Sequence, residues 1–219
     1  IKAYRKYLDL RAEISLPISM TGELFSLAAL HAFLGMPESE QYAIALEELA
    51  HKASLAPRRK RILWLHTLPN WQHSIRVLLE NNEHFEILAS DMTYDTLIDM
   101  DPEKPYESMA KRLVYNINNG GAHRRIDAAI SYAEKRHADG VIVFGQWGCK
   151  QTMGMSQLAK ISLEAHGFPT LVLDGDGCDP RNVADGQMLT RISAFLEQLE
   201  ARRGLVTPAN IRLSSSCMP

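Results

Sequence analysis

The architecture of this chain is set by two segments that are built alike: Gly140-Val-Ile-Val-Phe144 followed by Gly145-Gln-Trp-Gly-Cys149, and Thr170-Leu-Val-Leu173 followed by Asp174-Gly-Asp-Gly-Cys178. Each is a short apolar run that ends in a glycine-rich loop with a cysteine. Continuous Val, Ile and Leu runs are typical of parallel strands that are buried on both faces. Loops beyond the carboxyl ends of such strands lie where open α/β sheets bind ligands, so we expect both thiols to face one crevice.

A regular alternation of strands and helices extends over most of the chain. Further strands are predicted at residues 62–66 and 85–89, and helices at 71–81, 106–116, 124–137, 153–166 and 186–203. This pattern predicts an α/β fold, a Rossmann-like or flavodoxin-like three-layer sandwich with about four parallel strands. We assign the sandwich to residues 57–205. Residues 1–56 have helical periodicity and form a predicted helical lead-in, and residues 206–219 form a predicted irregular tail.

The composition is that of an ordinary globular protein. The chain has 219 residues, of which 46% are hydrophobic and 23% are charged, enough for one sizeable core. A formal net charge of -2 gives no electrostatic footprint for nucleic acid, and no apolar stretch approaches the length of a membrane span. We therefore expect no nucleic-acid partner and no membrane. The basic run Pro57-Arg-Arg-Lys-Arg61 is interpreted as a solvated linker rather than a nucleic-acid patch.

The cysteine count and the start of the chain bear on its origin. The sequence begins at Ile1, in what reads as a helix already under way, so we expect a fragment of a longer chain or one trimmed at its start. Three cysteines without a secretory signal do not suggest a disulfide scaffold and favour a reducing cytoplasm. Cysteines that the fold brings together in that compartment are more often metal-binding or reactive than structural.

The two loop cysteines differ in their surroundings. Cys149 precedes a predicted helix and adjoins Lys150, and both features stabilise a thiolate, which favours nucleophilic attack or metal ligation. Cys178 is flanked by three aspartates of its own loop, Asp174, Asp176 and Asp179. Such an acidic setting raises the pKa of a free thiol, disfavours a nucleophile and so argues for a metal ligand. Inert loop cysteines are the alternative, and Cys217 is expected to be a free thiol in a terminal polar segment.

Several segments follow one another in a recognisable order: Ala138-Asp-Gly-Val-Ile142, Cys149, Gly167-Phe-Pro-Thr-Leu-Val-Leu-Asp174 and Gly186-Gln-Met-Leu-Thr-Arg-Ile-Ser-Ala-Phe-Leu-Glu197. Together they resemble the 2-hydroxyacyl-CoA dehydratase and benzoyl-CoA reductase subunit family, over roughly residues 20–203. The resemblance implies an oxygen-sensitive iron-sulfur protein of two Rossmann-like domains, with a cluster held between them by cysteines of both. This chain resembles the second domain, in which Cys149 falls at the cluster-cysteine position. The cysteines of the first domain would lie upstream of Ile1.

The second thiol departs from the simplest dehydratase pattern, which needs one cysteine from this domain. Cys178 points towards relatives that resemble double-cubane cluster proteins, which are ATP-dependent low-potential reductases. In dehydratases the cluster passes one electron to a 2-hydroxyacyl-CoA thioester, and the resulting ketyl radical expels hydroxide. The resemblance thus implies a four-iron four-sulfur cluster or a double cubane, an activator ATPase as electron donor, and a second homologous or identical subunit. The substrate would be an acyl-CoA or another small molecule, and this part of the enzyme alone would be inactive.

Five further residues are candidate contacts of the cluster or substrate: Gln146, Trp147, Ser156, Gln187 and Arg191. Gln146 and Ser156 would donate hydrogen bonds, and Trp147 would stack on a ligand or cover the cluster from solvent. For Gln187, Thr190 and Arg191 a purely structural role is the alternative.

The sequence allows two roles for a pair of aspartates near the second strand, and a second interpretation of the whole chain. Asp91 and Asp95 would either bind a ligand hydroxyl or cap the next segment. A cluster-free α/β binding or structural domain, which retains the fold without the chemistry, is the rival interpretation of the whole chain.

Overall fold

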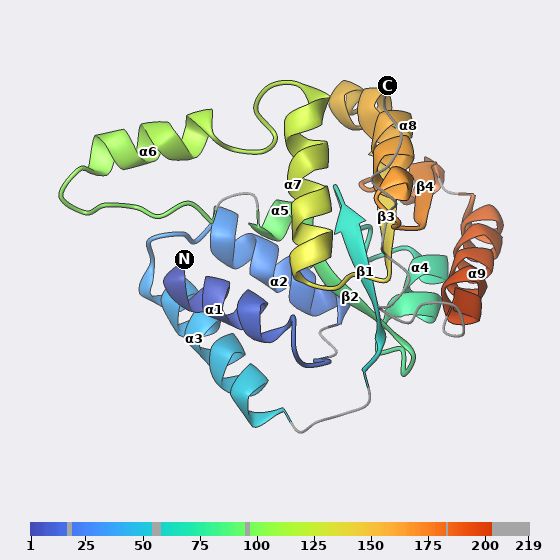
Figure 1. The fold of residues 1–219 in the computed structure, drawn as a ribbon, viewed down its shortest axis with the longest axis horizontal. Coiled ribbons are helices and arrows are strands. Elements are labelled where there is room, and N and C mark those ends of the chain that lie inside the picture. The colour runs from blue at the N-terminus through green and yellow to red at the C-terminus, as the bar shows by residue number, and fades with distance from the viewer. Residues whose placement is uncertain (17–18, 54–57, 95–96, 183, 203–219) are drawn as a thin grey trace, which may run out of the picture.

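The centre of the molecule is a parallel sheet. The computed structural model describes residues 1–16, 19–53, 58–94, 97–182 and 184–202. Its four strands run in the order β2-β1-β3-β4 (Figure 1), with β1 at Lys60–Leu65, β2 at Phe85–Ser90, β3 at Gly140–Gln146 and β4 at Thr170–Gly175. All pairs are parallel, which confirms the predicted fold class and strands. From β1 the chain moves outward to β2 on one side and to β3 and β4 on the other, so the topological switch point lies between β1 and β3.

Helices cover both faces of the sheet. In chain order they are α1 (Lys2–Leu10), α2 (Met20–His31), α3 (Pro37–Lys52), α4 (His73–Leu79), α5 (Asp91–Tyr94), α6 (Pro105–Val114), α7 (Ala122–Lys135), α8 (Lys150–Ala165) and α9 (Asp185–Ala201), with a 3-10 turn η1 (Pro180–Asn182). Helices α4 and α9 pack on one face against Trp64 and Phe144, whereas α7 and α8 pack on the other against Leu63 and Val143. Because successive strand residues point to opposite faces, both faces carry apolar side chains, which explains the uninterrupted apolar runs.

Two helix boundaries bear on the site. Helix α5 was not predicted, because four residues are too few to show a helical period, and it follows β2 directly. Helix α8 begins at Lys150 rather than at residue 153, so Cys149 is its N-cap residue. None of the helices in the described ranges is long and apolar enough to cross a membrane.

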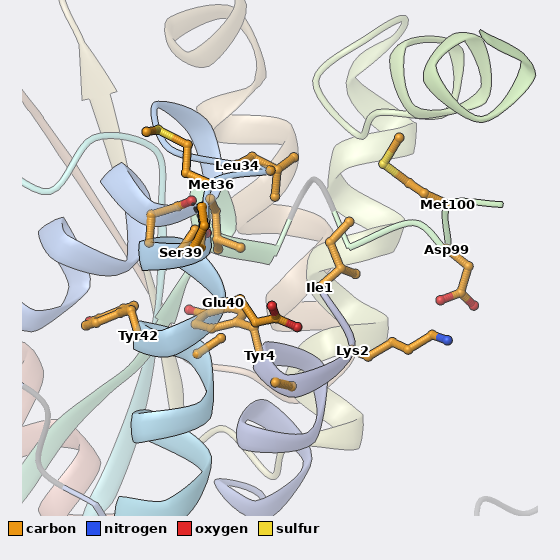
Figure 2. Close-up of a pocket in the computed structure, with 16 residues that line it drawn as sticks. Ile1, Lys2, Tyr4, Leu34, Met36, Ser39, Glu40, Tyr42, Asp99 and Met100 are labelled. Carbon is orange, nitrogen blue, oxygen red and sulfur yellow. Dashed lines mark hydrogen bonds between the residues drawn. The ribbon is translucent and has the colours of Figure 1, made fainter. Parts of the chain in front are cut away.

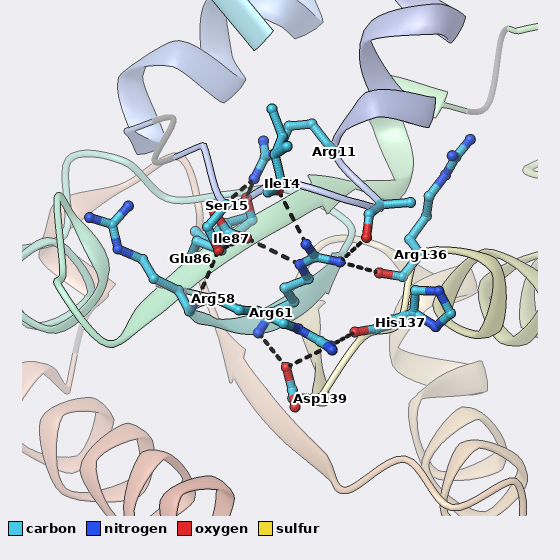
Figure 3. A network of polar contacts seen from close by, with 12 residues as sticks. Arg11, Ile14, Ser15, Arg58, Arg61, Glu86, Ile87, Arg136, His137 and Asp139 are labelled. Atoms are coloured by element: carbon cyan, nitrogen blue, oxygen red, sulfur yellow. Dashed lines mark hydrogen bonds and ion pairs between the residues drawn. The ribbon is translucent and has the colours of Figure 1, made fainter. Parts of the chain in front are cut away.

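The N-terminal helices are joined to the sheet by a third core and a buried ionic network. In the core, Tyr4, Tyr7 and Leu46 pack together with Ala89 of β2. In the network (Figure 3), Glu86 of β2 lies 3.5 Å from Nη2 of Arg11 and 3.3 Å from Nε of Arg61, and all three side chains are at most 1% exposed. The hydrogen bonds of both guanidinium groups extend to backbone carbonyls of neighbouring segments. The lead-in therefore docks through charge as well as apolar contact.

The interpretation of the basic run as a solvated linker is wrong for Arg61. This residue lies in β1, and its Nη1 donates to the carbonyl of Ala12 at 2.5 Å while its Nη2 donates to the carbonyl of Ile14 at 3.2 Å. The error arises because a sequence shows charge but not the buried carboxylate of Glu86 that partners it. Arg58, in contrast, is exposed as predicted.

Helix α6 stands away from the body of the molecule (Figure 1). Its large apolar side chains and the residue after it are between 54% and 87% exposed: Tyr106, Met109, Leu113, Val114 and Tyr115. Several exposed apolar side chains on one helix are typical of a contact with another protein surface.

Candidate functional site

Cys149 lies at the switch point, between the end of β3 and the start of α8. Its Sγ accepts a hydrogen bond from the backbone N–H of Thr152 at 3.4 Å and lies 3.2 Å from the Thr152 hydroxyl. The thiol is partly exposed, whereas Thr152 is fully buried. The sulfur is therefore held in a defined position at the carboxyl edge of the sheet, with the backbone N–H of Thr152 directed at it.

These contacts favour the thiolate. Partial burial raises the pKa of the Cys149 thiol, but hydrogen bonds from the side chain and backbone of Thr152 and from the Gln151 N–H, together with the charge of Arg125, lower it by more. The net pKa lies below its usual value. The sequence suggested Lys150 as a positive neighbour, and the structure adds Arg125 of α7, whose charge lowers the pKa of the thiol. A thiolate is the form of cysteine that ligates metals.

Arg125 connects Cys149 to the residues that follow β1 and β2. Its Nε donates to Oδ2 of Asp91 at 2.5 Å, and both side chains are at most 1% exposed. Its Nη1 lies 3.5 Å from the hydroxyl of Thr152. The other oxygen of Asp91 accepts the backbone N–H of His66 at 2.7 Å. Both oxygens of Asp91 are thus engaged inside the protein, and Asp91 serves an internal ion pair rather than a ligand hydroxyl. Asp95 lies outside the described residues.

His66 follows β1 at the switch point, and sequence reasoning gave it no role. Its backbone φ of 79° lies in the left-handed region that residues other than glycine rarely adopt. The carboxylate of Asp91 and the hydroxyl of Ser90, which donates to the His66 carbonyl at 3.1 Å, hold it there. Burial and then the charge of Arg125 lower the pKa of His66, while Asp91 raises it, and the net pKa falls. A strained backbone held by buried partners is common at functional sites. The available signal was its position at the end of a predicted strand.

The loop with Cys178 follows β4, which pairs with β3, so the two cysteine loops leave adjacent strands. That both thiols face one crevice stays a prediction. Gln146, the last residue of β3, ties them together. Its Nε2 donates to Oδ1 of Asp176 at 2.9 Å, and its Oε1 accepts the backbone N–H of Gly177 at 2.5 Å. Oδ1 of Asp176 also accepts the N–H of Cys178 at 3.0 Å. The amide of Gln146 is therefore engaged in shaping the loop, and the Cys178 side chain is exposed.

The aspartates of this loop have partners. A hydrogen bond from Gln146, followed by those from Cys178 and Asn182, lowers the pKa of Asp176 to about 2. Asp174 lies 3.1 Å from the guanidinium of Arg191 and Asp179 lies 2.5 Å from that of Arg181. Because two of the three carboxylates are paired with arginines, the setting of Cys178 is less negative than its sequence suggests.

Three of the predicted contact residues meet at one small cavity of about 60 Å³. Trp147, Gln187 and Arg191 line it together with residues of the Cys178 loop. Its volume has room for only a few water molecules. Ser156 does not share this cavity, and its hydroxyl donates to the Met153 carbonyl within α8 at 2.9 Å. The hydroxyl of Thr190 likewise bonds within its own helix.

A larger cavity, of about 480 Å³, lies beside the N-terminal helices (Figure 2). Its walls are mostly apolar and include Tyr4, Leu34, Met36, Tyr42 and Met100. None of the predicted site residues lines it.

The ligand set for a metal centre is partial. Among the residues that the structure describes, no three His, Cys, Asp or Glu side chains form a group that would hold a metal ion. Cubane clusters are held by four cysteine thiolates. Cys149, with its polar hydrogens and lowered pKa, fits the role of one such ligand, and Cys178 is placed on the adjacent loop. Cys217 lies outside the described residues.

The sequence of this chain matches one family model and is similar to a known protein. The family model "2-hydroxyglutaryl-CoA dehydratase, D-component" matches residues 1–199. The chain is also similar to lactoyl-CoA dehydratase subunit alpha from Anaerotignum propionicum, with 26% identity over 134 residues. That match covers 61% of this chain and 32% of the relative's length. Since the family match takes in the helical lead-in as well as the sheet, the chain belongs to the 2-hydroxyglutaryl-CoA dehydratase D-component family.

Proposed function

We propose that this chain supplies cysteine ligands to the iron-sulfur cluster of a 2-hydroxyacyl-CoA dehydratase. The observation that carries the proposal is Cys149, which lies at the switch point of a parallel sheet with two polar contacts from Thr152 at its sulfur. A ligand thiolate needs donors and positive charge nearby, because it is otherwise protonated at neutral pH. The chain belongs to a dehydratase family, and in such an enzyme this thiolate would serve as a cluster ligand.

The roles of the chain's own residues follow from their contacts. Cys149 would ligate through Sγ, with the backbone N–H of Thr152 and the Thr152 hydroxyl bonded to it. Trp147, which lies in the same loop as Cys149 and is 52% exposed, would limit the access of water. Gln187 and Arg191, on the small cavity next to it, would contact the cluster's surroundings or the substrate. When bound, a four-iron four-sulfur cluster would supply single electrons at low potential to the acyl-CoA substrate.

Cys178 separates two versions of this proposal. In the simpler version Cys149 is the sole ligand from this chain, as in a dehydratase with one four-iron four-sulfur cluster. In the other version Cys178 is a second ligand, and the centre is a double cubane of an ATP-dependent low-potential reductase. The link from Gln146 to the Cys178 loop supports joint action of the two loops.

The remaining ligands and partners lie outside this chain. We propose that an upstream domain or a second homologous subunit completes the cluster site, and that an activator ATPase delivers the electrons. The exposed apolar side chains of α6 support an assembly with another protein surface. The free thiols of Cys149 and Cys178 fit a reducing, cytoplasmic location.

The test is anaerobic reconstitution of the full-length protein with its partner subunit, followed by iron and sulfide counting and EPR spectroscopy. Cys149→Ser is expected to lose the cluster. Cys178→Ser is expected to retain it in the dehydratase version and to lose iron in the double-cubane version. Cys217→Ser is the matched control and should keep the iron content of the wild type. Folded protein whose iron content neither Cys149→Ser nor Cys178→Ser changes would contradict the proposal and support a cluster-free α/β binding domain.

A further inference from the structure

We propose that Arg125 is a positioning residue for Cys149 and acts through Thr152: it orients the Thr152 hydroxyl so that its single proton points at Sγ. The inference rests on the proposed function of Cys149 as a cluster ligand. It concerns two buried side chains that do not themselves ligate metal. Neither stands out in the sequence, because α7 and α8 are separated by a whole strand.

The first step is the direction of the hydrogen bonds. The Thr152 oxygen lies 3.2 Å from Sγ of Cys149 and 3.5 Å from Nη1 of Arg125. A guanidinium group only donates, whereas a hydroxyl has one proton and accepts through its lone pairs. Thr152 must therefore accept from Arg125, and its proton is left for the sulfur. Without Arg125 the hydroxyl would be free to turn its proton towards another acceptor.

The second step is the rigidity of Arg125. Its Nε is fixed by a 2.5 Å hydrogen bond to Asp91, which is fully buried. The second oxygen of that carboxylate is bound by the backbone N–H of His66. Asp91 has no freedom to turn away, so it holds the guanidinium group in one orientation. The arrangement links the ends of β1 and β2 to the sulfur at the end of β3.

The third step is the energetic cost of burying Arg125. Arg125 is 1% exposed, and within the described part of the chain its Nη2 has no hydrogen-bond partner. A buried ion pair with an unsatisfied donor is often no more stable than apolar residues of similar volume. Stability alone therefore does not explain why an arginine lies here, whereas directing Thr152 and placing a positive charge near the sulfur does.

The consequence is measurable as a reduction potential. A hydrogen bond to a ligand sulfur and a nearby positive charge both stabilise the more negative, reduced state of a cluster and raise its potential. Thr152→Val keeps the shape of the side chain but removes the hydroxyl. We expect this variant to retain its iron and to have a more negative midpoint potential than the wild type. Thr152→Ser restores the hydroxyl and should return the potential towards the wild-type value.

The experiment is an EPR-monitored redox titration of the reconstituted full-length protein and its partner subunit. Thr21→Val, an exposed threonine on α2, is the matched control and should leave the potential unchanged. Arg125→Lys keeps the charge but shortens the donor's reach, so it should lower the potential in the wild-type background. It should add little in the Thr152→Val background, because the two residues act in series. If valine prevents cluster assembly, Thr152→Ala takes its place.

Three outcomes overturn the inference. The midpoint potential of Thr152→Val could equal that of the wild type. Alternatively, the potential of Thr152→Ser could shift as far as that of Thr152→Val, and this second outcome would identify a packing effect. Full additivity of Arg125→Lys and Thr152→Val would show that Arg125 does not act through the hydroxyl. In each case a wild-type cluster of normal iron content leaves the proposed function intact. A wild-type protein without a cluster overturns both.

Discussion

The side chain of Gln146 reaches from β3 to Asp176 in the loop after β4, with 2.9 Å between its Nε2 and the carboxylate Oδ1. The oxygen of the same amide accepts the N–H of Gly177 at 2.5 Å. One side chain thus satisfies a donor and an acceptor of the neighbouring loop. Because Gln146 is part of the sheet, the position of the exposed Cys178 is set by β3 and not only by its own loop.

Gln146→Met is expected to release this loop. The substitution keeps the length of the side chain and removes both hydrogen bonds, which leaves the Gly177 N–H without its acceptor. We expect the free energy of unfolding to fall by about 1–3 kcal/mol. Urea denaturation measures it. Hydrogen exchange at the amides of Gly177 and Cys178 should also become faster.

Gln157→Met on α8 is the matched control for this prediction. Gln157 is exposed, so its replacement should change the free energy of unfolding by no more than about 0.5 kcal/mol. Equal effects of the two substitutions would contradict a special role for Gln146.

Gly177→Ala is expected to disturb the same loop by crowding. A Cβ at this position would lie 2.9 Å from Oε1 of Gln146 and 3.0 Å from Cγ2 of Thr67. Either the amide moves and loses its bonds or the loop shifts, so we expect a loss of about 1–3 kcal/mol in the free energy of unfolding. Gly154→Ala is the opposite case, since a Cβ there meets nothing within 4 Å and the residue lies inside α8. It should stabilise the protein by up to about 1 kcal/mol. The midpoint temperature of thermal unfolding should fall for Gly177→Ala and rise for Gly154→Ala. A rise in both would show that the loop has room for the added methyl group.

The sheet was predictable because its signal is local. The uninterrupted apolar run at residues 140–144 is visible in the sequence itself, and such a run indicates a strand that is buried on both faces. The position of Cys149 before a helix was equally local. What could not be predicted were partners that the fold brings together over long sequence distances. Arg61 reads as a surface charge until Glu86 is placed beside it.

The same limit explains what was missed at the site. Lys150 is the cation next to Cys149 in the sequence, but a lysine side chain on the first turn of an exposed helix surface has solvent to point into. Arg125 lies 24 residues before Cys149, on another helix, and only the packing of α7 beside α8 directs it at Thr152. His66 was equally hidden, because a single histidine at the end of a strand does not by itself predict a left-handed backbone conformation.

Arg11→Met is expected to destabilise the docking of the N-terminal helices. Arg11 is fully buried and lies 3.5 Å from Glu86 and 3.8 Å from Glu23. Removing one partner of a buried ion pair leaves an uncompensated charge, for which we expect a loss of about 3–5 kcal/mol in the free energy of unfolding. Lys6→Met on the same helix removes only the pair of an exposed lysine with the partly buried Glu47 and should change the free energy of unfolding by less than about 1 kcal/mol. Urea denaturation compares them, and a small loss for Arg11→Met would mean that water reaches the network.

Glu23→Gln is expected to change how stability depends on pH. Burial, opposed by the charge of Arg11 and by hydrogen bonds from Ser90 and Thr93, raises the pKa of Glu23 from 4.5 to about 7. Between these two values the folded protein holds a proton that the unfolded chain has released. The free energy of unfolding therefore falls as the pH rises from 4.5 to 7, by about 3 kcal/mol in total, and this contribution is constant above pH 7.

The glutamine variant has no proton to lose at this position. Its urea midpoint should match that of the wild type near pH 4.5 and exceed it increasingly up to pH 7, whereas Glu48→Gln on the exposed surface of α3 should follow the wild type throughout. Other groups, including Glu86, titrate alike in both proteins, so the difference between the curves isolates Glu23. Parallel curves would mean that Arg11 keeps Glu23 ionised in the folded state. The interior would then hold the carboxylates of Glu23 and Glu86 against two guanidinium groups, and stability would be lost only at acid pH, where these carboxylates take up protons.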